Sequence, residues 1–210
     1  MSSQSGSVYG LTLLCPIIDD DNPIPSHDLQ IRYHLSKLSL GPDGPFAIAP
    51  GTHLARLVVL DDVIYVGMPS CEEHLHSKYL VLECNCDGDR DSYLTGLLKH
   101  IPEQIDAIWQ HCTGYPGTKD LAAFLAYMRK CEVETTFFFA PVNDKSVTQT
   151  LSALQTQRAV AAFIATHQSC SAADLRQDFM VFIGCLAKAP PPLPAALSFR
   201  RELKTGGRNE

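Results

Sequence analysis

Apolar and polar positions along the chain recur with two different periods. Continuous or alternating apolar runs predict strands, and apolar positions repeated every three or four residues predict helices. Strands are expected at residues 8–17, 52–66, 78–86 and 133–141. Helices are expected at residues 26–38, 87–114, 121–128, 144–167 and 171–186. The predicted order is therefore strand, helix, strand, strand, helix pair, strand and two helices.

Local signals mark several boundaries. Pro102 is expected to kink or break the helix at residues 87–114, because proline lacks the amide hydrogen that a helix interior needs. Asp144 or Ser146, and then Ser171, are typical N-caps for the last two helices. We therefore expect these two helices to be separate elements.

Three of the predicted strands carry more specific expectations. An acidic pair within residues 52–66 indicates a turn or bulge, and the short spacing to residues 78–86 favours an antiparallel hairpin. Three consecutive phenylalanines make residues 133–141 apolar on both faces, as an interior strand requires. Residues 133–141 are therefore expected at the centre of the sheet.

This order fits an α+β domain of the ferredoxin-like βαββαβ kind, with one antiparallel sheet, helices mainly on one face and an extra C-terminal helix. Residues 1–186 are expected to form this single domain, because a chain of this length can bury one sizeable core. Residues 187–210 begin with a proline-rich stretch and continue as a polar tail, which predicts a linker and a flexible end.

Residues 52–60, 82–88 and 109–116 resemble an uncharacterised family of ferredoxin-like α+β folds, and the resemblance covers roughly residues 8–167. When such folds dimerise they are called dimeric α+β barrels, which include haem proteins such as chlorite dismutases and dye-decolorising peroxidases, monooxygenases and non-catalytic members. The resemblance implies the fold first, and implies function, including haem binding, only by analogy. The Gly-x-x-Asp-Gly signature of dye-decolorising peroxidases is not matched, since the nearest text is Cys86-Asp87-Gly88-Asp89.

Composition excludes several partners. The formal charge of −6 and the pI near 5.7 offer no basic surface to nucleic acid or to anionic lipid. The longest apolar run near the N-terminus, residues 9–18, is too short to span a bilayer, so no membrane association and a cytoplasmic location are expected. The eight cysteines lie scattered in apolar segments and are expected to be reduced and mostly buried thiols.

Signatures of several enzyme classes are absent from the sequence. It has no glycine-rich dinucleotide or phosphate loop, no His-Glu-x-x-His zinc motif and no Gly-x-Ser-x-Gly elbow. No catalytic residue is therefore assigned, and whether the protein is an enzyme stays open.

One cluster has the chemistry of a metal site. Cys71, His74 and His76 lie with two glutamates between two predicted strands, and thiolate and imidazole are ligands that zinc takes. Their spacing is not that of a standard zinc site, so a polar hairpin tip is the favoured interpretation. No metal site is assigned, and these three residues are the weak candidates for one.

A pocket for a small molecule is expected between the uncovered face of the sheet and the helix that ends at Gly114. Arg56 shares its face with apolar neighbours and needs a carboxylate, for which Glu83 on the neighbouring strand is the candidate. A structural ion pair is favoured over a ligand-binding arginine. The candidate pocket residues are His53, Arg56, Glu83, Asn85 and His111.

Three functional hypotheses follow. The leading one is a self-associating binding or structural module that forms a homodimer through its sheet and has no complete catalytic site. The alternative is an oxidoreductase, or a haem-binding or small-molecule-binding protein of the dimeric α+β barrel type. The third is recruitment of a partner by the proline-rich stretch that follows Lys188, because such stretches bind aromatic grooves as polyproline II helices.

Overall fold

The computed structural model describes residues 3–20, 23–67 and 73–192. The strands are β1 (Gln4–Ser5), β2 (Val8–Pro16), β3 (Thr52–Leu60) and β4 (Tyr79–Asp87). The helices are α1 (His27–Lys37), α2 (Pro45–Ile48), α3 (Arg90–His100), α4 (Pro102–Trp109), α5 (Leu121–Cys131), α6 (Val147–Thr166) and α7 (Ala172–Leu186). No helix in these described ranges is both long and apolar enough to cross a bilayer.

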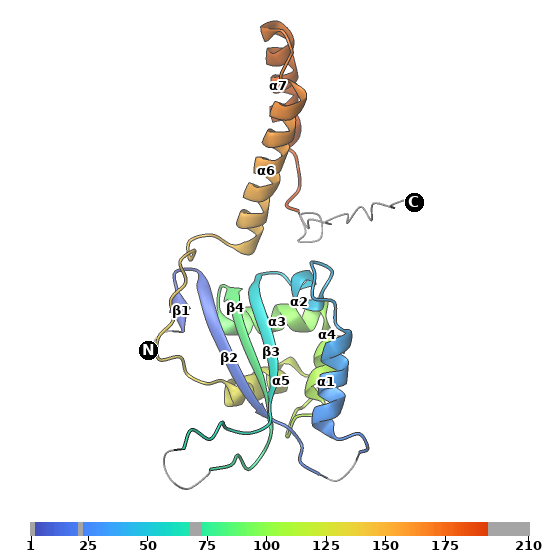
Figure 1. Cartoon of the computed structure of the whole chain (residues 1–210), viewed down its shortest axis with the longest axis vertical. Helices are drawn as coiled ribbons and strands as arrows, with labels where there is room; N and C mark the ends of the chain where they lie inside the picture. Colours follow the sequence, from blue (N-terminus) through green and yellow to red (C-terminus); the bar gives the residue numbers. More distant parts are fainter. Residues whose placement is uncertain (1–2, 21–22, 68–72, 193–210) are drawn as a thin grey trace, which may run out of the picture.

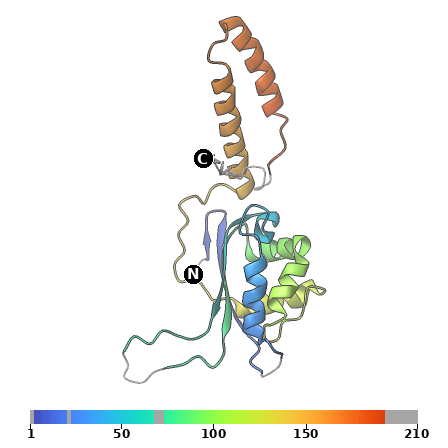
Figure 2. The same cartoon turned by 45° about the vertical axis from the view of Figure 1, so that its right-hand side comes forward.

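The four strands form one open antiparallel sheet in the order β1-β2-β4-β3. Strands β2 and β3 both run antiparallel to β4, which lies between them, so α1 connects two strands that are not neighbours. Helices α1 to α5 cover one face of the sheet, and the other face is not covered by a helix (Figures 1 and 2). This bare side is called the open face below.

Most of the predicted elements are confirmed, including the break at Pro102, which separates α3 from α4, and the antiparallel pairing of β3 with β4. The strand predicted at residues 52–66 ends at Leu60, at the acidic pair. Its bulge lies at the other end, where the pairing register shifts between Thr52 and Leu54.

The prediction of a central strand at residues 133–141 is wrong, because none of these residues lies in a strand. The short β1 hairpin already pairs with the outer edge of β2. Glu132 and Val133 contact the backbone of β2, through a bridge to Leu13 and a hydrogen bond from the Val133 amide to the Thr12 carbonyl. The chain then leaves the edge, so the strand order does not confirm the expected βαββαβ arrangement.

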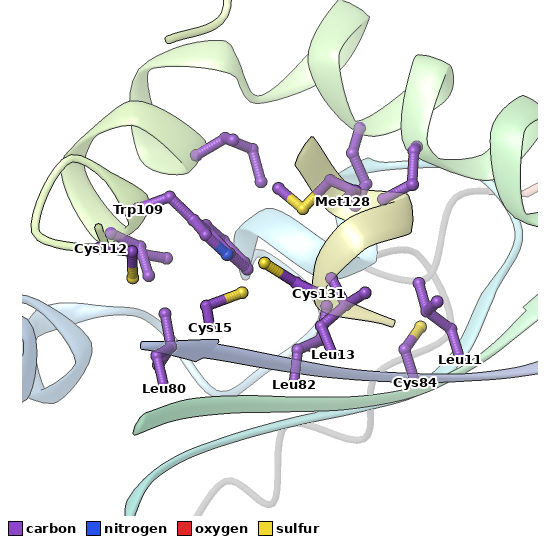
Figure 3. Packing of buried hydrophobic residues seen from close by; sticks show 14 of the residues in the cluster. Leu11, Leu13, Cys15, Leu80, Leu82, Cys84, Trp109, Cys112, Met128 and Cys131 are labelled. Atoms are coloured by element: carbon purple, nitrogen blue, oxygen red, sulfur yellow. The ribbon is translucent and has the colours of Figure 1, made fainter. Parts of the chain in front are cut away.

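A single buried cluster lies between the sheet and helices α1 to α5 (Figure 3). Alternate residues of β2 and β4 point into it, as the two-residue period of a strand requires, and Trp109, Phe124 and Met128 cover them from the helices. Each fully buried large apolar side chain contributes about 1.5–3 kcal/mol. The strand residues of the cluster are Leu11, Leu13, Cys15, Val59, Leu80, Leu82, Cys84 and Cys86.

Candidate functional site

Three of the five candidate pocket residues lie on the open face. Arg56 and Glu83 are register partners on β3 and β4, and their side chains form the ion pair that strand alternation predicts. Asn85 lies two residues further along β4, opposite Leu54 on one side and Gly10 on the other. Both charged side chains are well exposed, at 63% and 46%, so the pair lies in solvent rather than in a closed pocket.

His53 occupies the bulge of β3 and takes part in a contact that joins β3 to β4. Its Nε2 lies 2.8 Å from Oδ1 of Asp87, the last residue of β4. The other carboxylate oxygen, Oδ2, accepts a hydrogen bond of 3.0 Å from the backbone amide of Val147, the first residue of α6. Asp87 therefore ties the bulge of β3 to the start of α6, and this contact accounts for His53 without a ligand.

His111 is not brought together with the other four residues, because it lies on the helical side of the sheet. Its Nδ1 is 2.9 Å from Nδ1 of His27, at the start of α1, and only 9% of the residue is exposed. Burial, and then the proximity of His27 and His34, lower the pKa of His111. The contact between the two rings therefore holds α1 against the turn after α4.

The metal candidates do not form a site within the described residues. Cys71 lies outside them, and His74 Nδ1 is 2.7 Å from Oδ2 of Asp62. Asp62 also accepts backbone hydrogen bonds from Leu75 and Val63, and these contacts, the Leu75 amide first, lower its pKa to about 2. No group of three histidine, cysteine or carboxylate side chains in the described ranges could hold a metal ion.

His76, the third metal candidate, lies beside an acidic cavity of about 480 Å³. The cavity is also lined by Asp28 and Asp61, and Lys78 bonds the Asp28 carboxylate across 2.8 Å. Lys78 thus neutralises Asp28, which is the most buried of these carboxylates. The two side chains form an ion pair at one end of the sheet.

The sequence does not predict where α6 and α7 lie. They form an antiparallel hairpin that projects away from the rest of the molecule (Figures 1 and 2). Ser146 caps α6 in a reciprocal capping box with Gln149, and Ser171 caps α7, as the sequence predicts. Neither helix contains a buried residue.

The inner side of the hairpin is aromatic. The Phe163 ring stacks on His167 and on Phe182, with centroid distances of 4.0 and 4.7 Å, and meets Phe179 edge-on at 5.9 Å. A groove of about 590 Å³ runs along these rings and includes Ile164. The exposed large apolar residues of the hairpin are Leu154, Val160, Ile164, Leu175, Phe179, Met180, Val181 and Ile183.

The hairpin is also electrically neutral. It carries two arginines and two aspartates, whereas the whole chain has a formal charge of −6. One of the aspartates, Asp178, lies 3.3 Å from His167 across the hairpin. The negative charge of the protein therefore lies elsewhere in the chain. The surface formed by the eight exposed large apolar residues of the hairpin is called the hairpin stripe below.

The sequence alone indicates part of the apolar surface of the hairpin. Leu175, Phe179, Phe182 and Leu186 recur at helical spacing, which indicates an apolar stripe but not what covers it. Met180, Val181 and Ile183 extend the apolar surface beyond these four residues, and a helix that is apolar over most of its circumference is typical of a buried element.

A comparison with protein-family models, curated proteins and solved structures finds no match to this chain.

Proposed function

We propose that this protein is a self-associating module whose α6–α7 hairpin packs against the same hairpin of a second copy. The observation that carries the proposal is that 35 helical residues, 20 in α6 and 15 in α7, contain no buried side chain although they include eight exposed large apolar ones. The proposal keeps the homodimer expected from the sequence but places its interface on the hairpin instead of on the sheet.

A helical hairpin without a core is not expected to persist alone. Helices in proteins gain most of their stability from packing of an apolar face, and each ordered residue costs about 1–2 kcal/mol of backbone entropy. Burial of one large apolar side chain returns about 1.5–3 kcal/mol. Covering the hairpin stripe supplies this missing stabilisation, and a four-helix bundle made from two hairpins covers all four helices at once.

The charge distribution supports a second copy as the occupant. A two-fold interface brings the same patch together with itself, so a charged patch would repel its mate. The hairpin stripe is neutral, and a dimer formed by projecting hairpins keeps the negatively charged remainder of each chain apart. Two copies can therefore meet through this surface without a net electrostatic penalty.

The open face is a weaker candidate for the dimer interface than the hairpin is. The sequence hypothesis of association through the sheet was motivated by the triple-phenylalanine strand, which does not form. Leu54 and Val58 are exposed there, but the Arg56–Glu83 ion pair occupies the middle of the face and is satisfied in solvent. Antiparallel sheets commonly leave one face to water.

The proposal is tested by sedimentation velocity and light scattering on the full chain between about 1 and 100 µM, a range set by micromolar to nanomolar dimer affinity. The expected mass is twice the 23.1 kDa of one chain. Ile164→Asp and Phe179→Asp, both in the groove, should shift the protein to monomer. Leu40→Asp is the matched control, because Leu40 is fully exposed outside the hairpin and should leave the dimer intact.

Two outcomes would overturn the proposal. One is a monomer throughout the concentration range. The other is a dimer that survives Ile164→Asp but dissociates with Val58→Asp, since Val58 lies on the open face. That second result would return the interface to the sheet.

A further inference from the structure

Three cysteines converge at the end of the core that is closed by α5. Cys15 lies on the core face of β2, and Cys131 is the last residue of α5. The two are brought together because Leu13 bridges to Glu132, the residue after Cys131. Their sulfur atoms point toward each other, with Cys112 nearby (Figure 3). All three are free thiols.

Two polar groups are buried around these sulfurs without a close hydrogen-bond partner. They are the indole Nε1 of Trp109, whose residue is 1% exposed, and the hydroxyl of Tyr127, whose residue is 8% exposed. Neither group makes a hydrogen bond, but the indole faces the Cys15 sulfur and the hydroxyl faces the sulfurs of Cys131 and Cys112, and each lowers the pKa of the thiol that it faces because it favours the thiolate. A buried donor that lacks a close acceptor costs about 1–3 kcal/mol, so the site retains unused hydrogen-bonding capacity.

The two facing thiols are not equivalent. Cys131 lines a cavity of about 670 Å³, between α5 and the turn that contains Thr113, Gly114 and Pro116. Cys15 lies behind it and is 1% exposed. A small molecule in the cavity therefore reaches Cys131 before Cys15.

The thiolate is also stabilised on the accessible side. The Cys15 thiol, the Tyr127 hydroxyl and the charge of Lys130 together outweigh burial and lower the pKa of Cys131. The same contact, together with burial, raises the pKa of Cys15. A lower pKa raises the fraction of the thiol that is present as thiolate, which is the nucleophilic form.

We infer that Cys131 and Cys15 form a redox-active thiol pair that reduces a small hydroperoxide, with Cys131 as the attacking sulfur and Cys15 as the resolving one. The Cys131 thiolate attacks the terminal oxygen of the hydroperoxide, an S–O bond forms, and the O–O bond breaks. The leaving alkoxide takes up a proton and departs as the alcohol. Cys131 is oxidised by two electrons to a sulfenic acid.

Cys15 then attacks the sulfenic sulfur. An S–S bond forms, the S–O bond breaks, and the hydroxyl leaves as water together with the proton of Cys15. The added oxygen on Cys131 supplies an acceptor for the Tyr127 hydroxyl, which lacks one in the reduced protein. An external dithiol returns the disulfide to two thiols and is itself oxidised to a cyclic disulfide.

The first test uses the unmodified full-length chain and hydrogen peroxide. After exposure under native conditions, the expected product is one Cys15–Cys131 disulfide, seen as the loss of two hydrogens in the intact mass and mapped by peptide analysis without reduction. Dithiothreitol should restore the starting mass. The inference is overturned if folded protein treated with peroxide forms no disulfide between these two residues.

Variants separate the two roles. In Cys15→Ser the reaction should stop at the sulfenic acid, which dimedone traps on Cys131, whereas Cys131→Ser should give neither adduct nor disulfide. Cys84→Ser is the matched control, because Cys84 is an equally buried core thiol that contacts Tyr93 instead. Circular dichroism confirms folding of each variant. Dimedone labelling of Cys112 or Cys84 at the same rate as Cys131 would mean that Cys131 is an ordinary core thiol.

Discussion

The Nδ1 atoms of His27 and His111 lie 2.9 Å apart, so one ring must donate the hydrogen bond and the other must accept it. The contact is possible only while at least one ring is neutral, because two protonated rings would present two donors to each other. It joins the first residue of α1 to the turn that follows α4, two segments that are 84 residues apart in the chain.

We predict that the free energy of unfolding falls as the pH drops below about 6.5, the ordinary pKa of an unfolded histidine. Burial, followed by His27 and His34, lowers the pKa of His111 in the fold, so the unfolded chain binds more protons in this range. The stability is complete above the unfolded pKa and is lost as the pH falls toward the lower folded one. Urea unfolding at pH 8, 6.5 and 5.5 measures the effect.

His111→Gln should flatten this pH dependence, since glutamine can hydrogen-bond but does not titrate. His100→Gln is the matched control, because His100 is exposed at the end of α3. An equally steep loss of stability in His111→Gln and in the unmodified protein would assign the effect to other groups.

The ion pair between Asp28 and Lys78 should matter more than the one between Arg56 and Glu83. Burial of Asp28 opposes ionisation, but hydrogen bonds from Lys78 and Ser26 outweigh it and lower the pKa of the carboxyl. Lys78→Met leaves a buried carboxylate without its cation and should cost about 1–3 kcal/mol in urea unfolding. Arg56→Met breaks an exposed pair and should cost less than about 1 kcal/mol. Equal losses would contradict the difference in burial.

Gly10 makes room for the displaced triple-phenylalanine segment. A Cβ placed on Gly10 would lie 2.7 Å from Cδ2 of Phe138, so the ring covers the glycine on the open face. Gly10→Ala should therefore destabilise the protein by about 1–3 kcal/mol through overpacking. Phe138→Ala removes the obstructing ring, so the double variant should lose less than the sum of the two single losses. Strict additivity would show that the two residues do not meet.

The extent to which the sequence predicts this fold depends on how local each signal is. Pro102, Ser146 and Ser171 mark helix boundaries through backbone chemistry within one turn, and all three predictions are confirmed. The Arg56–Glu83 pair is confirmed because strand alternation fixes which side chains share a face. These features need no knowledge of distant segments.

The failures involve long-range competition. Three consecutive phenylalanines show that residues 133–141 are apolar, but not that the two residues of β1 take the edge of β2 first. The predicted pocket includes His111, but its partner in the structure is His27, which is 84 positions away and which no local pattern indicates. Periodicity likewise detects the stripe of α7 without identifying what packs on it.

Tyr127 provides a test that separates stability from thiol chemistry. Its hydroxyl is buried without a close partner, so Tyr127→Phe should leave the free energy of unfolding unchanged or raise it by up to about 1 kcal/mol. The same change removes a group that lowers the pKa of Cys131, so the midpoint of its alkylation rate with pH should move upward. Tyr115→Phe is the matched control: its hydroxyl donates to Asp106 across 2.8 Å, so it should cost about 1 kcal/mol and leave the Cys131 midpoint in place. If Tyr127→Phe destabilised the protein while the midpoint stayed unchanged, the hydroxyl would be a packing group and not part of a thiol site.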